Sequence, residues 1–150
     1  MSFTVSLPAD YAYVVAVAVP GVISLLTFQS INVSKARKAA NVAYPAEYAE
    51  ASVAERDIKA KKFNCAQRAH QNQLENLPVF LLTLLHTGLY YPRAAAACGA
   101  IYLLGRVAYT IGYSSGDPAK RQRGVIAYIG FLPLLVTSMY KAISALPVFH

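Results

Sequence analysis

Four long apolar stretches constrain the fold of this chain more than any other feature of its sequence. The longest run without charge lies between Asp10 and Lys35 and holds 24 residues. The other three stretches enclose one charged residue each, namely Glu75, Arg106 and Lys141. A helix of about 20 apolar residues matches the ~30 Å hydrocarbon layer of a bilayer, because each residue adds about 1.5 Å. The pattern therefore predicts an all-α membrane protein with four transmembrane helices.

Composition and length agree with this prediction. Charged residues make up 14% of the chain and hydrophobic residues 56%, with a mean hydropathy of +0.37, whereas soluble domains average about 25% charged residues. A length of 150 residues predicts one domain over residues 1–150. The first stretch differs from a signal peptide because it lacks a basic leader and is too long. Two cysteines without framework spacing predict neither a disulfide nor a metal site.

Basic residues are grouped in loops, which argues against nucleic acid as the reason for the net charge of +7. We predict spans at about 11–34, 64–91, 94–114 and 124–146, connected up and down, with a kink at Pro20-Gly21 and a surface helix around Ala46–Lys62. The first connection holds seven basic residues, the second one and the third three. The positive-inside rule then places loops 35–62 and 114–123 in the cytosol.

A polar helical face opens the second span. Over Phe63–Phe80, residues Arg68, Asn72 and Glu75 fall at i, i+4 and i+7, and therefore share one side of a helix. Gln71 and Asn76 flank them. Such polarity at the start of an apolar run indicates a polar partner. From this segment alone, a polar helix start in a soluble bundle is an equal alternative.

In an up-and-down arrangement, four helix ends bring polar residues from distant parts of the sequence to one surface. Snorkelling arginines and an interfacial belt of tyrosines are the simpler interpretation, and they explain Arg37 and Arg121. They do not explain Glu75 and Arg106, about two helical turns inside the membrane, where charge is normally paired or functional. We predict that these two lie within reach of each other or of one ligand. The set comprises Arg37, Lys38, Arg68, Asn72, Glu75, Asn76, Arg106, Tyr109, Tyr113, Lys120, Arg121 and Arg123.

The residue types in this set favour a small zwitterionic ligand. Several arginines favour bidentate capture of carboxylates. A lone glutamate favours one ammonium group, and asparagine and tyrosine suit amide and hydroxyl partners. Glutathione has this pattern of groups, although composition alone does not name it.

The segment Arg68-Ala-His-Gln-Asn72-Gln-Leu-Glu75 resembles the Arg-x-x-x-Asn-x-x-Glu signature of the MAPEG family, the membrane-associated proteins in eicosanoid and glutathione metabolism. Similar blocks are spread over all four spans, and within the family they are most similar to the type-3 branch of the microsomal glutathione S-transferases. The blocks are Ile31–Lys38, Phe63–Cys65, Gln67–Asn72, Tyr91–Arg93, Gly105–Val107 and Gly112–Gly124. Together the six blocks are highly specific evidence for the resemblance, whereas the Arg/Asn/Glu triplet alone is weak evidence.

The resemblance implies a four-helix subunit that forms a homotrimer in the endoplasmic reticulum membrane, or also in the outer mitochondrial membrane. It implies glutathione as co-substrate, bound between neighbouring subunits near the cytosolic side, with a lipophilic second substrate and no metal. The implied glutathione contacts are Arg37, Arg68, Asn72, Glu75, Tyr109 and Tyr113, with His70 and Gln71 at the edge and Asn76 and Arg106 in the same set.

The resemblance also implies that an arginine at the start of the fourth span stabilises the glutathione thiolate. A free thiol with a pKa near ~8.5 is mostly protonated at neutral pH, and a nearby cation lowers that pKa. Because the turn before this span is longer than in some relatives, either Arg121 or Arg123 fits, and we favour Arg121. Lys38 is a candidate second base. Asn76 departs from relatives that have a tyrosine there, which removes one hydroxyl contact.

Two function classes follow from these expectations. The first is a glutathione transferase and glutathione-dependent peroxidase that acts on lipophilic electrophiles and lipid hydroperoxides. The alternative is a non-catalytic lipid-binding or scaffold protein on the same bundle, resembling the 5-lipoxygenase-activating relative. The arginines, tyrosines and Glu75 favour the enzyme, and the apolar residues of the sequence do not name the lipophilic substrate.

Overall fold

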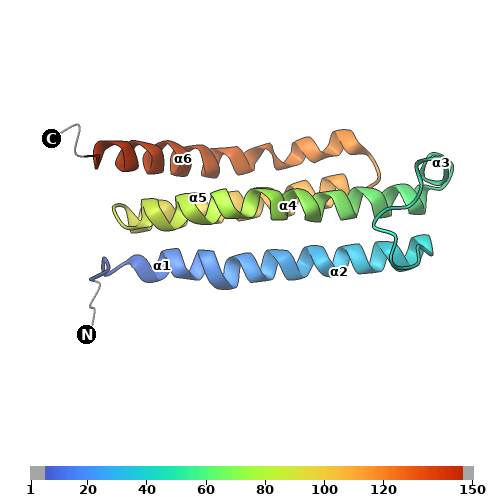
Figure 1. Cartoon of the computed structure of the whole chain (residues 1–150), viewed down its shortest axis with the longest axis horizontal. Coiled ribbons are helices and arrows are strands. Elements are labelled where there is room, and N and C mark those ends of the chain that lie inside the picture. The colour runs from blue at the N-terminus through green and yellow to red at the C-terminus, as the bar shows by residue number, and fades with distance from the viewer. Residues whose placement is uncertain (1–5, 147–150) are drawn as a thin grey trace.

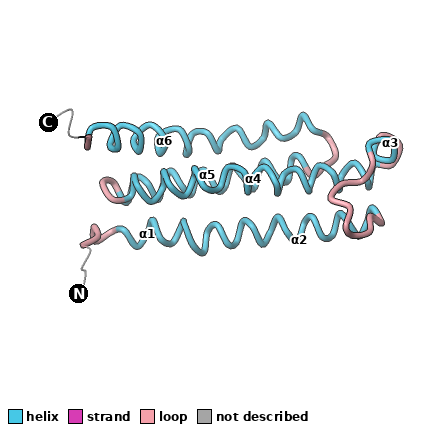
Figure 2. The backbone as a smooth tube through the Cα atoms, viewed as in Figure 1, coloured by secondary structure: helices cyan, strands magenta, loops and turns pink. Residues whose placement is uncertain are grey.

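Helix is the dominant secondary structure in the computed structural model, which describes residues 6–146 and contains no strand there (Figure 2). The elements are α1 (Tyr11–Ala16), the π-helical turn η1 (Val17–Gly21), α2 (Val22–Ala40), α3 (Ala51–Ala54), α4 (Ile58–Gly88), α5 (Pro92–Tyr113), the 3₁₀ helix η2 (Pro118–Val125) and α6 (Ile126–Ser144). The all-helical prediction is confirmed for the described residues. At Pro20-Gly21, where a kink is predicted, the helix contains the π-helical turn η1.

The long helical segments lie side by side and alternate in direction (Figure 1). Both described ends of the chain lie at the same end of the molecule as the α4–α5 turn. The segment with α3 and the turn before η2 lie at the opposite end (Figure 1). This order of connections is the up-and-down order that the sequence predicts.

Three helical segments are long and apolar enough to cross a membrane: Tyr11–Ala40, Pro92–Tyr113 and Pro118–Ser144. α4 is not among them, because polar residues fill its first half. The finding supports a membrane protein with at least three spans among the described residues. The fourth span and the homotrimer stay predictions.

Two predicted boundaries in the first connection are wrong. The surface helix expected around Ala46–Lys62 is reduced to the short α3, and α4 begins at Ile58 instead of near residue 64. The side chain of Asp57 accepts a hydrogen bond from the Lys59 backbone N–H at 2.8 Å and caps the start of α4. The helix therefore begins six residues before the predicted start of the second span.

Small residues let α5 and α6 approach closely, as the sequence predicts. A Cβ atom on Gly130 would lie 2.2 Å from the Cys98 carbonyl oxygen, and one on Gly105 would lie 2.3 Å from the Ala127 backbone nitrogen. The Phe80 ring from α4 stacks on the Tyr102 ring from α5 at a centroid distance of 4.0 Å. α4, α5 and α6 therefore meet tightly along the side where the site residues gather.

Candidate functional site

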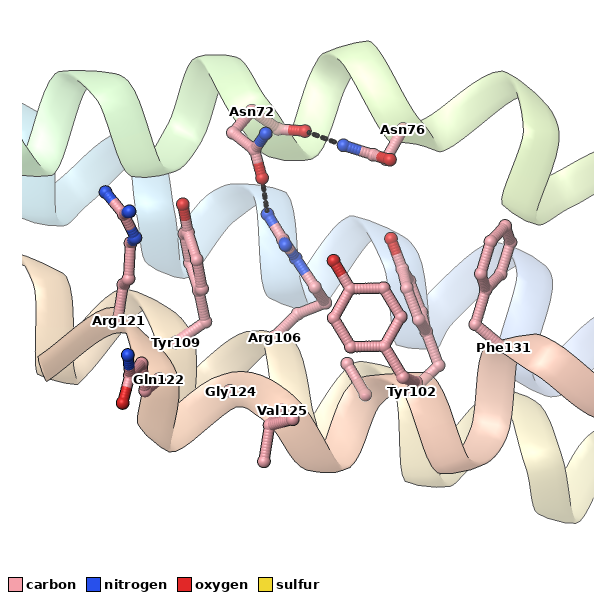
Figure 3. Close-up of a pocket in the computed structure, with 12 residues that line it drawn as sticks. Asn72, Asn76, Tyr102, Arg106, Tyr109, Arg121, Gln122, Gly124, Val125 and Phe131 are labelled. Atoms are coloured by element: carbon pink, nitrogen blue, oxygen red, sulfur yellow. Dashed lines mark hydrogen bonds between the residues drawn. The ribbon is translucent and has the colours of Figure 1, made fainter. Parts of the chain in front are cut away.

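A pocket of about 680 Å³, here named the Arg106 pocket, opens between α4, α5 and the η2–α6 segment (Figure 3). It is lined by Asn72, Asn76, Tyr102, Arg106, Tyr109, Arg121, Gln122, Gly124, Val125, Ala127, Tyr128 and Phe131. One end is polar and the other is aromatic. The pocket brings together five residues that the sequence singles out, namely Asn72, Asn76, Arg106, Tyr109 and Arg121.

Arg106 is the buried cation of this pocket, with 8% of its surface exposed. Its Nε donates to the Gln73 side-chain oxygen at 2.6 Å. One Nη donates to the Asn72 side-chain oxygen at 2.9 Å, as Figure 3 shows. Its guanidinium carbon lies 4.3 Å from the centre of the Tyr109 ring. All three partners are neutral, so the side chain is held in place while its charge is left uncompensated by a carboxylate.

Glu75 does not lie on the side of α4 that contacts Arg106. It pairs with Arg68. The Arg68 Nη1 and Glu75 Oε1 atoms are 2.8 Å apart, and both side chains are close to half exposed. Of the two predicted alternatives, direct contact between Glu75 and Arg106 is wrong within one subunit, and a ligand shared by the two stays a prediction. The physical reason is that Arg68, one charge seven residues away on the same exposed face, reaches Glu75, whereas Arg106 enters beside Gln73 and Asn72.

A second hollow of about 490 Å³, here named the Arg68 groove, lies where the α3 segment meets α4 and the end of α5. Arg68 and Tyr113 line it together with Tyr48 and Cys65. The Tyr48 hydroxyl donates to the Gln71 side-chain oxygen. Burial raises the pKa of Tyr48, so this hydroxyl keeps its proton at neutral pH. The groove thus holds a further part of the predicted set.

The two hollows are neighbours at the end of α5. Tyr109 lines the Arg106 pocket and Tyr113 the Arg68 groove, and their rings meet edge to face with centroids 5.6 Å apart. One extended ligand could therefore contact both.

Six of the predicted glutathione-binding or catalytic residues line neither hollow in the subunit, namely Arg37, Lys38, His70, Gln71, Glu75 and Arg123. Arg37 is buried between the rings of Tyr44 and Phe63, at 4.4 and 4.5 Å, and donates to the Ala46 carbonyl at 2.6 Å. It thereby fixes the loop after α2. Lys38 and Arg123 are exposed. Their predicted roles, and that of Arg37, stay predictions.

A buried polar network of neutral residues, which the sequence does not predict, connects three helices. Gln29 from α2 donates to the Thr110 hydroxyl on α5 at 2.8 Å, and its oxygen lies 3.4 Å from His70 Nδ1 on α4. Thr110 in turn donates to the Arg106 carbonyl at 2.8 Å. A glutamine inside the longest apolar run was the available signal. Gln73 was equally missed, because it carries no charge.

Comparison with known proteins agrees with the motifs on α4 and α5. The profile of the MAPEG family matches residues 14–142, which is most of the chain. The chain belongs to the MAPEG family. Together with its three apolar helices, this membership indicates an integral membrane protein.

Individual relatives of this MAPEG protein match over shorter stretches. Human microsomal glutathione S-transferase 2 is 39% identical over 75 residues, which cover 49% of this chain and 50% of the relative. Leukotriene C4 synthase of Cavia porcellus is 33% identical over 106 residues, which cover 70% of this chain and 63% of the relative. The chain thus spans about half to two thirds of the length of the curated relatives it matches. Assignment to the type-3 branch stays a prediction.

Proposed function

We propose that this MAPEG protein is a membrane-bound glutathione transferase and glutathione-dependent peroxidase. The observation that carries the proposal is the Arg106 pocket: two arginines and no carboxylate among its lining residues, next to an aromatic end. Such a pocket suits an anionic sulfur at its polar end and a lipophilic reactant at the other. The names of the relatives, which concern glutathione transfer and leukotriene C4 synthesis, agree with this chemistry.

In the proposed mechanism, glutathione lies across both hollows. Arg68 and the tyrosines hold its polar groups, Glu75 takes its ammonium group, and Arg121 stabilises the thiolate. The thiol proton leaves to solvent. The sulfur then attacks an electrophilic carbon and expels the leaving group with its bonding electrons. With a hydroperoxide, the sulfur attacks the outer oxygen, the O–O bond breaks, and the alkoxide takes a proton from solvent and leaves as the alcohol. A second glutathione then converts the sulfenic acid to disulfide and water.

We propose further that the subunits form a homotrimer in the endoplasmic reticulum membrane, with a glutathione site between neighbours. The exposure of Arg68 and Glu75 in the single subunit is compatible with a site that a second subunit completes. Arg37, Lys38, His70 and Gln71 are the candidates for contacts from that neighbour. Membership of the MAPEG family supports this arrangement.

The rival function is lipid binding without catalysis. The aromatic end of the Arg106 pocket, formed by Tyr102, Tyr128 and Phe131, favours an apolar guest whether or not chemistry follows. The two functions differ in one respect: an enzyme consumes glutathione, and a scaffold does not.

A substrate panel in detergent separates these functions. We expect the purified protein to consume glutathione with a small aryl halide, a fatty-acid hydroperoxide or an epoxide eicosanoid, since one thiolate serves all three reactions. Conjugates and disulfide are measured by chromatography, with S-methylglutathione as the control that cannot react. Lipid binding without consumption of glutathione on any of the three would favour the scaffold.

Membrane orientation provides a separate prediction. In a background without Cys65 and Cys98, single cysteines introduced as Glu55→Cys and Asp117→Cys should react with an impermeant maleimide in sealed microsomes. Arg93→Cys, at the opposite end of the bundle, should react only after permeabilisation. The reason is the ten basic residues on the α3 and η2 side, against one in the α4–α5 turn. The reverse labelling pattern would put the site on the lumenal side.

A further inference from the structure

Gln73 is a buried glutamine on α4 that the proposed mechanism does not yet use. Its side chain has no exposed surface. Its oxygen accepts the Arg106 Nε–H at 2.6 Å and faces the Tyr102 hydroxyl at 3.5 Å. Within residues 6–146 its side-chain nitrogen has no hydrogen-bond partner. Burying an amide nitrogen in this way is costly, so contact with Arg106 is the main polar contribution of this side chain.

Because the Gln73 side chain is neutral, it holds Arg106 without neutralising its charge. A glutamate of the same shape would hold the guanidinium equally well and would also neutralise it. With amide partners, the Arg106 cation stays uncompensated by any carboxylate lining its pocket. A buried cation without an anion is unfavourable, so the pocket favours a ligand that brings a negative charge to this point.

The position of Arg106 indicates which ligand group carries that charge. In Figure 3, Arg106 lies between Tyr109 and Arg121 on one side and Tyr102 and Phe131 on the other. The reacting sulfur must meet the lipophilic reactant at this boundary between the polar and the aromatic end. The carboxylates of a tripeptide can instead use exposed cations, such as Arg68, and keep part of their water.

We propose that Gln73 is a positioning residue that fixes Arg106 and leaves its charge free for the sulfur anion of glutathione. Arg106 then supports the sulfur from inside the pocket, and Arg121 supports it from the mouth. This inference rests on the proposed function and adds a second cation to it.

The substitution Gln73→Glu tests the proposal, because it keeps the shape and the acceptor atom but neutralises Arg106. We expect the ligand-free protein to melt at a higher temperature, since a buried cation gains a partner. We expect the thiolate absorbance of bound glutathione at neutral pH to fall about tenfold or more, since an opposite charge near a titrating group shifts its pKa by at least about one unit. The affinity for S-methylglutathione should stay within about twofold, because this ligand has no thiol and its sulfur carries no negative charge for Arg106 to stabilise.

Gln67→Glu is the matched control, because it adds the same charge to α4 outside both hollows. It should leave the thiolate signal unchanged. If Gln73→Glu does not fold, Gln73→Met gives the answer: Arg106 keeps its charge but loses its anchor, and the thiolate fraction should drop below that of the wild type.

Three results would overturn the inference. A wild-type thiolate signal in Gln73→Glu, or in Gln73→Met where only that variant folds, would make Gln73 a packing residue and leave the proposed function intact. A parallel loss of S-methylglutathione affinity would assign Arg106 to a carboxylate. The absence of any thiolate signal in the wild-type protein would remove the proposed function and this inference together.

Discussion

Arg121→Ala is expected to reduce the turnover of glutathione conjugation by about 100-fold or more, the usual cost of removing one group that stabilises a developing anion. Binding should change far less, because Arg68 and the tyrosines, the proposed glutathione contacts, stay in place. Glutathione should therefore still protect the variant against heat, while its thiolate absorbance at neutral pH falls well below that of the wild type. Turnover and absorbance are measured on the same detergent preparation.

The pH dependence of the Arg121→Ala variant follows from the same argument. Without Arg121, only Arg106 supports the sulfur, so the thiol pKa rises toward its ordinary ~8.5 and more of the thiol is protonated at neutral pH. Raising the pH through that value should restore part of the rate, whereas the wild-type rate should already be near its maximum at neutral pH. Arg121→Lys should keep partial activity, because it supplies a point charge without the planar fork.

Arg123→Ala is the internal control for the position of the thiolate arginine. Arg121 lines the Arg106 pocket and Arg123 does not, so the Arg123 variant should behave like the wild type. If Arg123→Ala loses the thiolate and Arg121→Ala keeps it, the assignment along the 3₁₀ helix is wrong by two residues.

Gly130→Leu is expected to cost about 3 kcal/mol or more of stability, the upper part of the range for overpacked cores. A Cβ on Gly130 would meet the Cys98 carbonyl oxygen at 2.2 Å and the Tyr102 backbone nitrogen at 2.7 Å. Backbone atoms cannot swing aside as a side chain does, so α6 must move away from α5. Because Tyr102 and Phe131 line the Arg106 pocket, glutathione binding should fail with the fold.

Thermal melting in detergent with and without glutathione measures this effect. Ala97→Leu is the matched control, because Ala97 is an exposed small residue on the same helix as Cys98. It should melt close to the wild-type temperature. Equal melting temperatures for Gly130→Leu and the wild type would show that the α5–α6 contact tolerates separation.

The sequence predicted the helices and their order because many residues mark each apolar run and each basic loop. The prediction therefore does not depend on any single contact. It also predicted close packing of the third span, since small residues on a membrane helix let neighbouring helices approach closely. The start of α4 was missed although its signal, the capping residue Asp57, is local. The apolar pattern begins later than the helix does, and the prediction followed the pattern.

The partners of individual site residues could be predicted only in part. Helical periodicity placed Asn72 and Arg106 correctly toward one pocket, but it could not say that Arg68 reaches Glu75 first. The position of the Arg37 side chain depends on the rings of Tyr44 and Phe63, which come from a loop and another helix. Nothing in the sequence marks Gln73 as a site residue, because a neutral side chain among charged neighbours becomes informative only when its burial is known.

The central claim is that this MAPEG protein binds glutathione and ionises its thiol. The most direct measurement is the ultraviolet difference spectrum of the purified wild-type protein at neutral pH, with glutathione and with S-methylglutathione. Thiolate absorbance that rises and saturates with glutathione, and does not appear with S-methylglutathione, is the predicted result. A protein that binds glutathione tightly without any thiolate absorbance, or that does not bind it, would contradict the claim.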